Sequence, residues 1–254
     1  MKGNMVFHYR RPSGRAQVSG AALALVLACT VGCLPEQDGE AAAPSKTPTA
    51  SADPRSNGVA KLSPGEIVSR TRKAAESASY LRMRAQVTDQ GQKYKLDFRF
   101  AGKTKATGWF TQGSQRVEIT RLGRTIYLSG NKAFWKSAGG SSAVRLLSGK
   151  HVKTTATNSD FKEIAAFTNR TALLTDVLKS TKGWKKGKPG NIRGVPTVVL
   201  YNGRGDTLEV AAQGAPYPLL LGGTLGDRLE YLEFGKPVRI QRPKGPVIDV
   251  DAMG

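Results

Sequence analysis

Apolar and polar residues alternate along two long runs that begin near Tyr80. In both runs the apolar residues occupy every second position: Leu81, Met83, Ala85 and Val87, then Tyr94, Leu96, Phe98 and Phe100. Alternation with a period of two predicts strands with one apolar and one polar face, and the intervening Asp89-Gln90-Gly91 predicts the turn of a hairpin. Shorter alternating runs at 106–111, 115–121 and 125–129 extend this hairpin to an antiparallel meander of about five strands.

Helical patterns lie on both sides of this meander. Before it, a capping serine, a proline and a glutamate three residues after the cap predict a helix over residues 63–77 (Ser63, Pro64 and Glu66). After it, apolar residues at helical spacing predict a helix over 141–150, a second from the capping pair Asp160 and Glu163, and a third from Asn169.

Strand patterns return in the last third of the chain. Apolar runs separated by glycine-containing turns predict further strands at 195–201, 207–212, 217–221 and 228–234. Strands and helices do not alternate one by one, so an antiparallel sheet is favoured over a parallel one. About nine strands in one sheet curl strongly. We therefore predict an α+β fold in which a strongly curved antiparallel sheet, a half-barrel, wraps around helices.

The N-terminal segment has the three parts of a secretory signal. Basic residues (Arg10, Arg11 and Arg15) precede an apolar stretch that is too short to span a membrane permanently, and small residues follow it. The segment ends in cysteine, and in this it resembles a bacterial lipoprotein signal. The resemblance implies that the cysteine sulfur receives a diacylglyceryl group and becomes the first residue of the mature chain.

Two cysteines compete for this role. Cys33 follows a glycine and directly precedes a polar stretch. The residue three positions before Cys29, however, fits a lipoprotein signal better than the residue three positions before Cys33. We favour Cys33, and an ordinary secreted protein with two incidental cysteines is the alternative. The predicted division is a signal peptide at 1–32, a flexible linker at 33–60 that is rich in Ala, Pro, Ser and Thr, and one folded domain at 61–254.

The net charge and the cysteines of the chain further limit the partners and the kinds of site that we expect. The net charge is +20, and residues 1–32 carry four of these charges, so the remainder carries +16. Such a balance attracts anionic headgroups or wall polymer, while export removes the chain from most nucleic acid, which we do not expect as a partner. Both cysteines precede the domain, so we expect no disulfide and no thiolate metal site in it.

Recognisable catalytic motifs do not occur in the sequence. The domain has one histidine, His151, in a basic setting that favours a surface residue. Glu230 and Glu233 are a candidate acid–base pair, but their spacing favours the polar side of a strand. We predict no enzymatic activity, no cofactor and no metal. The apolar residues of so many strands either form a filled core or line a cavity for an apolar ligand, and the pattern alone leaves both open.

One family has the same order of elements. The chain resembles the actinobacterial LppX/LprG lipoproteins, whose fold is similar to that of the lipoprotein carriers LolA and LolB. The resemblance rests on the signal ending at Cys33, the helix at 63–77, the first meander and, above all, the runs 195–201, 208–210 and Gly214-Ala215-Pro216-Tyr217-Pro218. It implies a half-barrel around helices, with a cavity that accepts the acyl chains of envelope lipids.

These observations predict a protein anchored on the extracytoplasmic face of the cell membrane that holds or carries a lipid or lipoglycan. The acyl chains would lie against eight apolar residues: Leu81, Met83, Leu96, Phe98, Val117, Ile119, Val198 and Leu200. An anionic headgroup would lie near Lys185, Lys186 and Lys188. Two alternatives remain: a protein-interaction or envelope-sensor module with a filled core, and a basic lipoprotein that binds wall polymer.

Overall fold

The computed structural model describes residues 55–254, apart from residues 90, 181, 224–225 and 254. The predicted signal peptide, Cys29, Cys33 and most of the predicted linker lie outside the described residues. Among the residues that are described, no helix is both long enough and apolar enough to cross a membrane. Within the described residues, Val59 is buried and opens a short 3-10 helix, η1 (Val59–Lys61), two residues before the predicted domain boundary.

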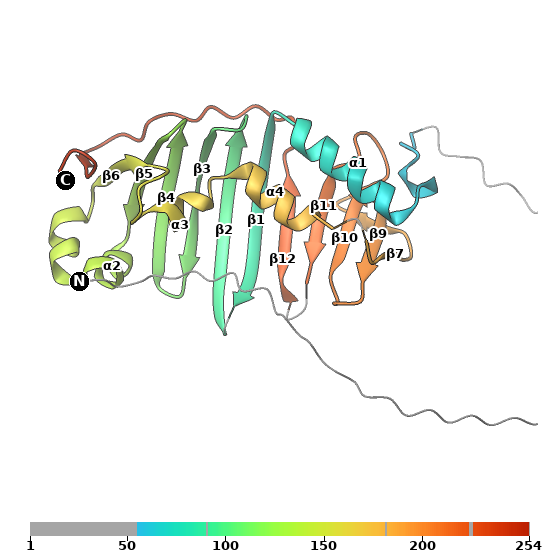
Figure 1. Cartoon of the computed structure of the whole chain (residues 1–254), viewed down its shortest axis with the longest axis horizontal. Coiled ribbons are helices and arrows are strands. Elements are labelled where there is room, and N and C mark those ends of the chain that lie inside the picture. Colours follow the sequence, from blue (N-terminus) through green and yellow to red (C-terminus); the bar gives the residue numbers. More distant parts are fainter. Residues whose placement is uncertain (1–54, 90, 181, 224–225, 254) are drawn as a thin grey trace, which may run out of the picture. The chain divides into compact units, whose positions relative to one another are not determined.

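Thirteen strands of the described chain form a single curved, unclosed sheet (Figure 1). They are β1 (Tyr80–Asp89), β2 (Gln92–Ala101), β3 (Lys105–Gln112), β4 (Gln115–Leu122), β5 (Thr125–Gly130), β6 (His151–Thr155), β7 (Trp184–Lys186), β8 (Gly190–Ile192), β9 (Val195–Asn202), β10 (Thr207–Ala211), β11 (Pro218–Gly222), β12 (Arg228–Leu232) and β13 (Val247–Asp249). Their order is β13-β6-β5-β4-β3-β2-β1-β12-β11-β10-β9-β7, with β8 paired to β9. The predicted antiparallel sheet is confirmed, and β13 adds one short parallel pairing with β6.

The pairing of β1 with β12 joins the two predicted meanders into this one sheet. Met83 lies opposite Tyr231 and Ala85 opposite Leu229, while Arg84 lies opposite Glu230. Because side chains alternate between faces along a strand, this register continues both faces across the junction. We call the side that carries Leu81, Met83, Phe98, Ile119, Leu200, Leu208 and Tyr231 the apolar face, and the side that carries Arg82, Arg84, Asp97, Trp109, Glu118 and Glu230 the polar face.

Helices cross the apolar face (Figure 1). They are α1 (Pro64–Ser77), α3 (Lys162–Ala166) and α4 (Arg170–Leu178), while α2 (Lys132–Leu147) follows β5 at one end of the sheet. The predicted start of α1 is confirmed: the Ser63 hydroxyl accepts from the Glu66 N–H, and the Glu66 carboxylate accepts from the Ser63 N–H at 2.9 Å. The predicted start at Asn169 is also confirmed, since its side chain accepts from the Ala172 N–H.

Two helix predictions were wrong in detail. The helix expected over 141–150 begins earlier, at Lys132, and is interrupted at Gly139 and Gly140, whose backbone angles are not helical. Asp160 does not cap α3, which begins at Lys162 after Phe161 without any side-chain cap. Instead, the Asn158 side chain accepts from the Asp160 N–H. Asp160 therefore belongs to a local turn before the helix and is not its cap.

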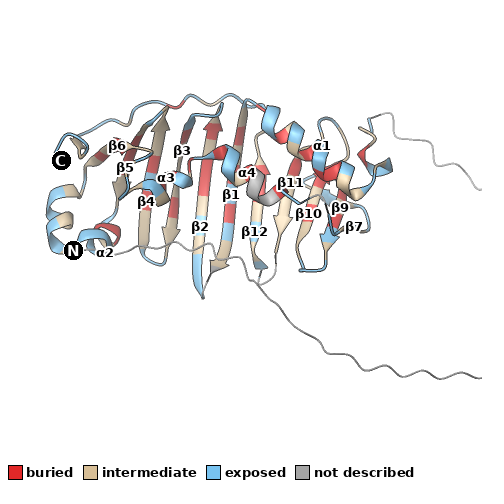
Figure 2. Cartoon of the chain, in the orientation of Figure 1, coloured by how far each residue is buried: buried red, intermediate tan, exposed pale blue. Residues whose placement is uncertain are grey.

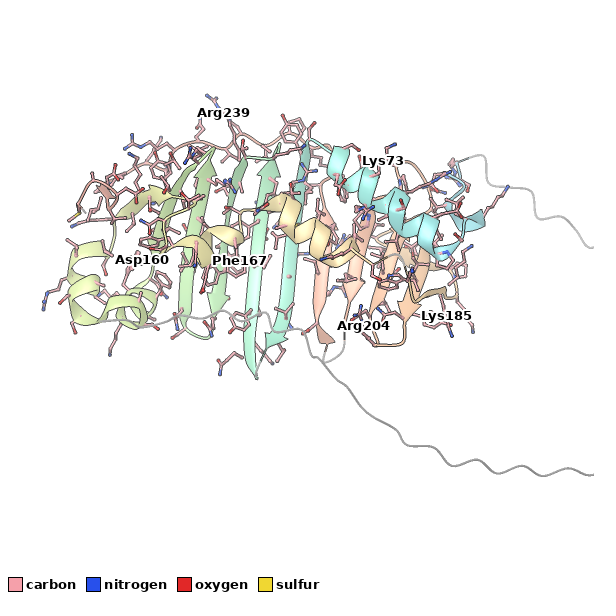
Figure 3. The ribbon with its side chains drawn as sticks, in the orientation of Figure 1. Lys73, Asp160, Phe167, Lys185, Arg204 and Arg239 are labelled. Carbon is pink, nitrogen blue, oxygen red and sulfur yellow. The ribbon has the colours of Figure 1, made fainter. Side chains whose placement is uncertain are left out.

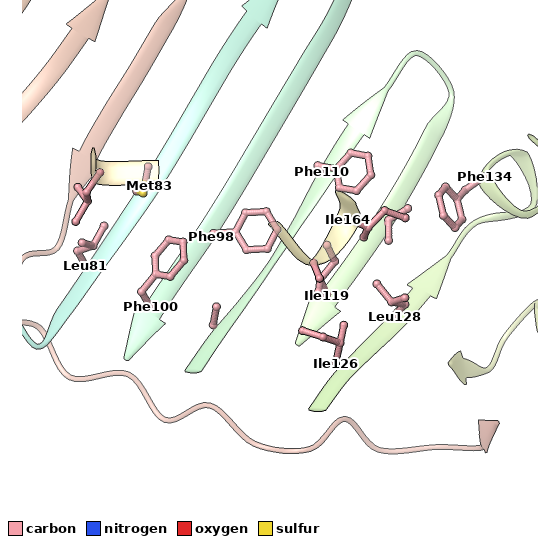
Figure 4. Close-up of a cluster of buried hydrophobic side chains, with 14 of the residues drawn as sticks. Leu81, Met83, Phe98, Phe100, Phe110, Ile119, Ile126, Leu128, Phe134 and Ile164 are labelled. Atoms are coloured by element: carbon pink, nitrogen blue, oxygen red, sulfur yellow. The ribbon is translucent and has the colours of Figure 1, made fainter. Parts of the chain in front are cut away.

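The apolar side chains form two buried clusters (Figures 2 and 4). The larger one joins strands β1 to β6 and β12 to residues of α2, α3 and α4, and Figure 4 shows Phe98, Phe100 and Ile119 in its middle. The smaller one joins β9 and β10 to α1 and the end of α4. Ala75 of α1 belongs to the larger cluster and Ile67 to the smaller one, so α1 packs on both.

A glycine makes the close packing of β2 against β3 possible. Gly108 lies between Phe98 and Ile119 in the sheet, where both neighbours are large and fully buried. A Cβ at this position would lie 2.2 Å from the Asp97 carbonyl oxygen and 2.6 Å from a ring carbon of Phe98. The backbone oxygen cannot move without disturbing the β2–β3 pairing, so only glycine fits.

We expect Gly108→Ala to lower the free energy of unfolding by about 1–3 kcal/mol, which is the usual cost of forcing extra volume into a packed core. Chemical denaturation measures this effect. Gly203→Ala is the matched control, because a Cβ there meets nothing within 4 Å. Equal stability of the two variants would show that β2 and β3 are not packed as described.

Candidate functional site

The eight apolar residues predicted to line a cavity all belong to the two apolar clusters. Seven are buried, and Leu96 is half-buried. The larger cluster contains six of them: Leu81, Met83, Leu96, Phe98, Val117 and Ile119. Val198 and Leu200 belong to the smaller cluster near α1. The structure thus brings six of the eight together and places the other two in a separate part of the apolar face.

Helical residues cover this face. Ile164, Ala165 and Leu174 pack into the larger cluster, and Ile67, Val68 and Leu178 pack into the smaller one. Phe167, labelled in Figure 3, stacks on Phe110 of β3 with ring centroids 4.9 Å apart. The margin of the larger cluster is only partly buried and consists of apolar residues that include Leu96, Phe161, Leu173 and Leu229. The covering elements therefore leave an apolar margin open to solvent.

Two buried hydroxyls on this face have no hydrogen-bond partner within the described structure: those of Tyr231 and Thr71. Tyr231 is 1% exposed in the larger cluster, and burial raises the pKa of its phenol. Thr71 lies on α1 between Ile67, which packs in one cluster, and Ala75, which packs in the other. An unpaired buried hydroxyl costs about 1–3 kcal/mol, so these two are costly features of an otherwise apolar region.

A buried arginine connects two of the covering helices. Arg170 is 3% exposed at the start of α4 and donates to the carbonyl oxygens of Ala75 (2.6 Å), Glu76 (3.3 Å) and Gly102 (3.3 Å). Two of these carbonyls belong to the last turn of α1, where the helix dipole favours a cation. Burial lowers the pKa of Arg170. Sequence reasoning missed this residue, because nothing in its local pattern predicts that it would be buried.

The three lysines proposed for a headgroup do not form one cluster. Lys185 and Lys186 are neighbours on β7, opposite Tyr201 and Leu200 respectively, so they project from opposite faces of the sheet. Lys186 donates to the Ala60 carbonyl at 2.8 Å. Lys188 is exposed after the end of β7. β7, with Lys185 labelled in Figure 3, is the last strand at its end of the sheet, and none of the three lysines belongs to the larger apolar cluster.

Glu230 and Glu233, the candidate acid–base pair, are bound by different arginines. Glu230 accepts from Arg84, Arg193 and Arg228, and Glu233 from Arg82 and Arg99. Burial by itself raises the pKa of each carboxyl, but the arginine hydrogen bonds and charges hold both pKa values below their ordinary range. Glu230 lies on the polar face, as the strand spacing predicted, and both groups are held ionised.

His151 begins β6 and is half-buried beside a hollow of the polar face. Within the described ranges, no three His, Cys, Asp or Glu side chains are grouped so that they could hold a metal ion.

No protein-family model matches this sequence, and no curated protein matches it. Solved structures do match. LprF from Mycobacterium bovis is 14% identical, with 72% of this chain and 97% of that chain covered and a TM-score of 0.51. The lipoprotein LppX from Mycobacterium tuberculosis is 14% identical, with 70% and 98% covered and a TM-score of 0.45. The described part of the chain therefore has the fold of LprF, and the predicted half-barrel is confirmed.

Removing the unpaired hydroxyl of Tyr231 tests the description of the apolar face. We expect Tyr231→Phe to raise the free energy of unfolding by about 1 kcal/mol, since the ring stays and only an unpartnered polar group is lost. Urea denaturation provides the measurement. Tyr201→Phe, at a side chain that is 43% exposed, is the control and should change stability by less than about 0.5 kcal/mol. Loss of stability in Tyr231→Phe would reveal a partner for the hydroxyl.

Proposed function

We propose that this protein is a lipid-anchored, extracytoplasmic protein that holds an acylated lipid on the apolar face of its sheet and carries out no catalysis. The acyl chains lie among the six residues of the larger cluster named above, with Leu96 at the open margin. Cys33, outside the described residues, carries the diacylglyceryl anchor. The part of the predicted linker before Ser56, the first residue that pairs with the domain, lets the domain move away from the membrane surface.

One observation carries this proposal: the helices that cover the larger cluster leave its margin, which includes Leu96, Phe161 and Leu229, only partly buried. The two helices that cross the middle of the apolar face, α3 and α4, have five and nine residues. Isolated helices shorter than about 12–15 residues are marginal, and α3 also lacks a side-chain cap. Because Arg170 ties α4 to α1, we propose that α3 is the helix that a ligand displaces, which exposes apolar residues of the larger cluster.

The energy available from an acyl chain is of the same order as the cost of such an exchange, since exposing each large side chain such as Ile164 or Phe167 costs about 1.5–3 kcal/mol. Burying about ten methylenes contributes roughly 8 kcal/mol before ordering costs. The bound chain replaces Ile164, Ala165, Phe161 and Phe167 as the cover of the larger cluster. The fold shared with LprF and the resemblance of the 195–218 segment to the LppX/LprG family support this assignment.

Native mass spectrometry of the purified full chain tests lipid binding. We expect a co-purifying lipid, and we expect Leu96→Gln to reduce the bound fraction several-fold because it places an amide on the open margin of the apolar face. The control is Lys93→Gln, an exposed residue of the same strand that lines neither hollow, which should leave the bound fraction unchanged. A full chain without any lipid would favour the interaction module, and salt-dependent retention on wall polymer would favour the wall-binding alternative.

Membrane fractionation tests the anchor. We expect Cys33→Ala to move the protein from the membrane fraction to the soluble extracytoplasmic fraction, because a lipid chain contributes about 0.8 kcal/mol for each buried methylene. Cys29→Ala is the matched control and should leave the protein on the membrane. The opposite result for the two variants would assign the anchor to Cys29.

A further inference from the structure

Three arginines converge on one carboxylate on the polar face. Arg84 and Arg228 each donate two hydrogen bonds to Glu230, at 2.9–3.0 Å and 2.9–3.2 Å, and Arg193 donates one at 2.7 Å. The arginine side chains are 49%, 54% and 46% exposed, whereas that of Glu230 is 11% exposed. They come from three separate parts of the chain: β1, the turn between β8 and β9, and β12. We call these four residues the arginine cluster.

The arginine cluster has an uncompensated charge of +2, because one carboxylate faces three guanidinium groups. A pair of opposite charges would need only one arginine, and like charges held this close repel each other. Each guanidinium has five N–H donors in a planar fork that matches the oxygens of phosphate. The excess charge and the exposed guanidinium groups make the cluster complementary to an anion from solvent.

A hollow lies beside the arginine cluster. It has a volume of about 210 Å³. Its lining consists of three cationic residues, one acidic residue and four uncharged ones: Arg84, Lys95, Arg228, Glu230, Gln86, Trp109, Ala85 and Leu96. Lys95 lies next to the cluster on the neighbouring strand β2 and adds a further positive charge. The strands that form the hollow, β12, β1, β2 and β3, are consecutive in the sheet (Figure 1).

Trp109 separates this hollow from a second one of about 350 Å³. The second hollow is lined by the hydroxyls of Thr107, Thr120 and Tyr127 and by charged side chains of both signs, Arg82, Arg99, Asp97 and Glu118. Arg82 and Arg99 pair with Asp97 and Glu233, and Glu118 pairs with Arg116, so the charges of this hollow are balanced. One hollow thus has an excess of positive charge and the other has balanced charges and three hydroxyls, and Trp109 lines both.

We propose that the polar face is a second binding site, independent of the apolar face, and that it takes a phosphorylated sugar. The phosphate binds Arg84, Arg228 and Lys95 in the smaller hollow. The sugar ring packs against Trp109, over whose ring the Arg116 guanidinium also lies at 4.4 Å from the centroid, and its hydroxyls reach the threonine and tyrosine hydroxyls of the larger hollow. The opposite side of the same sheet holds the acyl chains in the proposed function, so the two sites can be occupied together.

Isothermal titration of the full chain with glucose 6-phosphate, inorganic phosphate and glucose tests this site. We expect glucose 6-phosphate to bind at least about tenfold more tightly than glucose, because a charge-assisted hydrogen bond is worth about a factor of ten or more. Arg84→Gln with Arg228→Gln should weaken glucose 6-phosphate at least tenfold. Arg228→Gln alone, at the most exposed of the three arginines, provides a milder variant if the double variant does not fold.

Two further variants separate the site from a general charge effect. Lys73→Gln with Lys103→Gln removes the same charge from exposed positions on α1 and in the β2–β3 turn, and should change binding less than twofold. Glu230→Gln removes the competing carboxylate, so we expect phosphate to bind several-fold more tightly. If the arginines served the fold alone, Glu230→Gln would leave phosphate binding unchanged. That result, or equal losses in the control and the arginine variants, would overturn the proposal.

Trp109→Ala distinguishes the sugar from the phosphate. It should weaken glucose 6-phosphate several-fold and leave inorganic phosphate unchanged, with circular dichroism confirming that the fold is retained. Vesicles of phosphatidylglycerol, compared with phosphatidylcholine, test the other source of phosphate. Binding to phosphatidylglycerol that requires Arg84 and Arg228, without binding of glucose 6-phosphate, would overturn the assignment to a sugar and identify a lipid headgroup instead.

Discussion

The alternation of side chains along each strand is the constraint on which this structure depends. Every long strand gives one row of apolar residues and one row of polar residues, and antiparallel pairing aligns the rows of neighbouring strands. The long strands aligned in this way bring their apolar side chains to one side of the sheet, where two clusters have to be kept from water. A closed barrel would turn that side inward. This sheet is unclosed, so its helices have to cover the apolar side, and a ligand can share that role with them.

The two sides of the sheet consequently have different chemistry. The register between strands decides which side chains lie on each side. A shift of one residue between β1 and β12 would bring Tyr231 to the polar face and Glu230 to the apolar face. The hydrogen bonds from Arg84 to Glu230 and the packing of Met83 beside Tyr231 therefore favour the same alignment. An apolar site on one side and an arginine cluster on the other are thus linked by one pairing of strands.

Much of this architecture follows from local sequence. The strands β1 to β5 and the start of α1 were predictable because period-two alternation and a capping box are local signals. The strands β6, β7, β8 and β13 were not predicted, since they have three to five residues and their sequences are polar or lie near prolines. The arginine cluster was also beyond local reasoning. Arg84 and Glu230 are 146 positions apart and meet only because β1 pairs with β12.

The two ends of the strand order have a further consequence. β7 and β13 each have only three residues, and β7 carries Lys185 and Lys186. A long, flat margin with free N–H and C=O groups would be a template on which a second copy could add its own strand. Margins this short, with lysines on one of them, give such a copy little backbone to pair with. A protein with such margins can thus keep an open sheet without polymerising edge to edge.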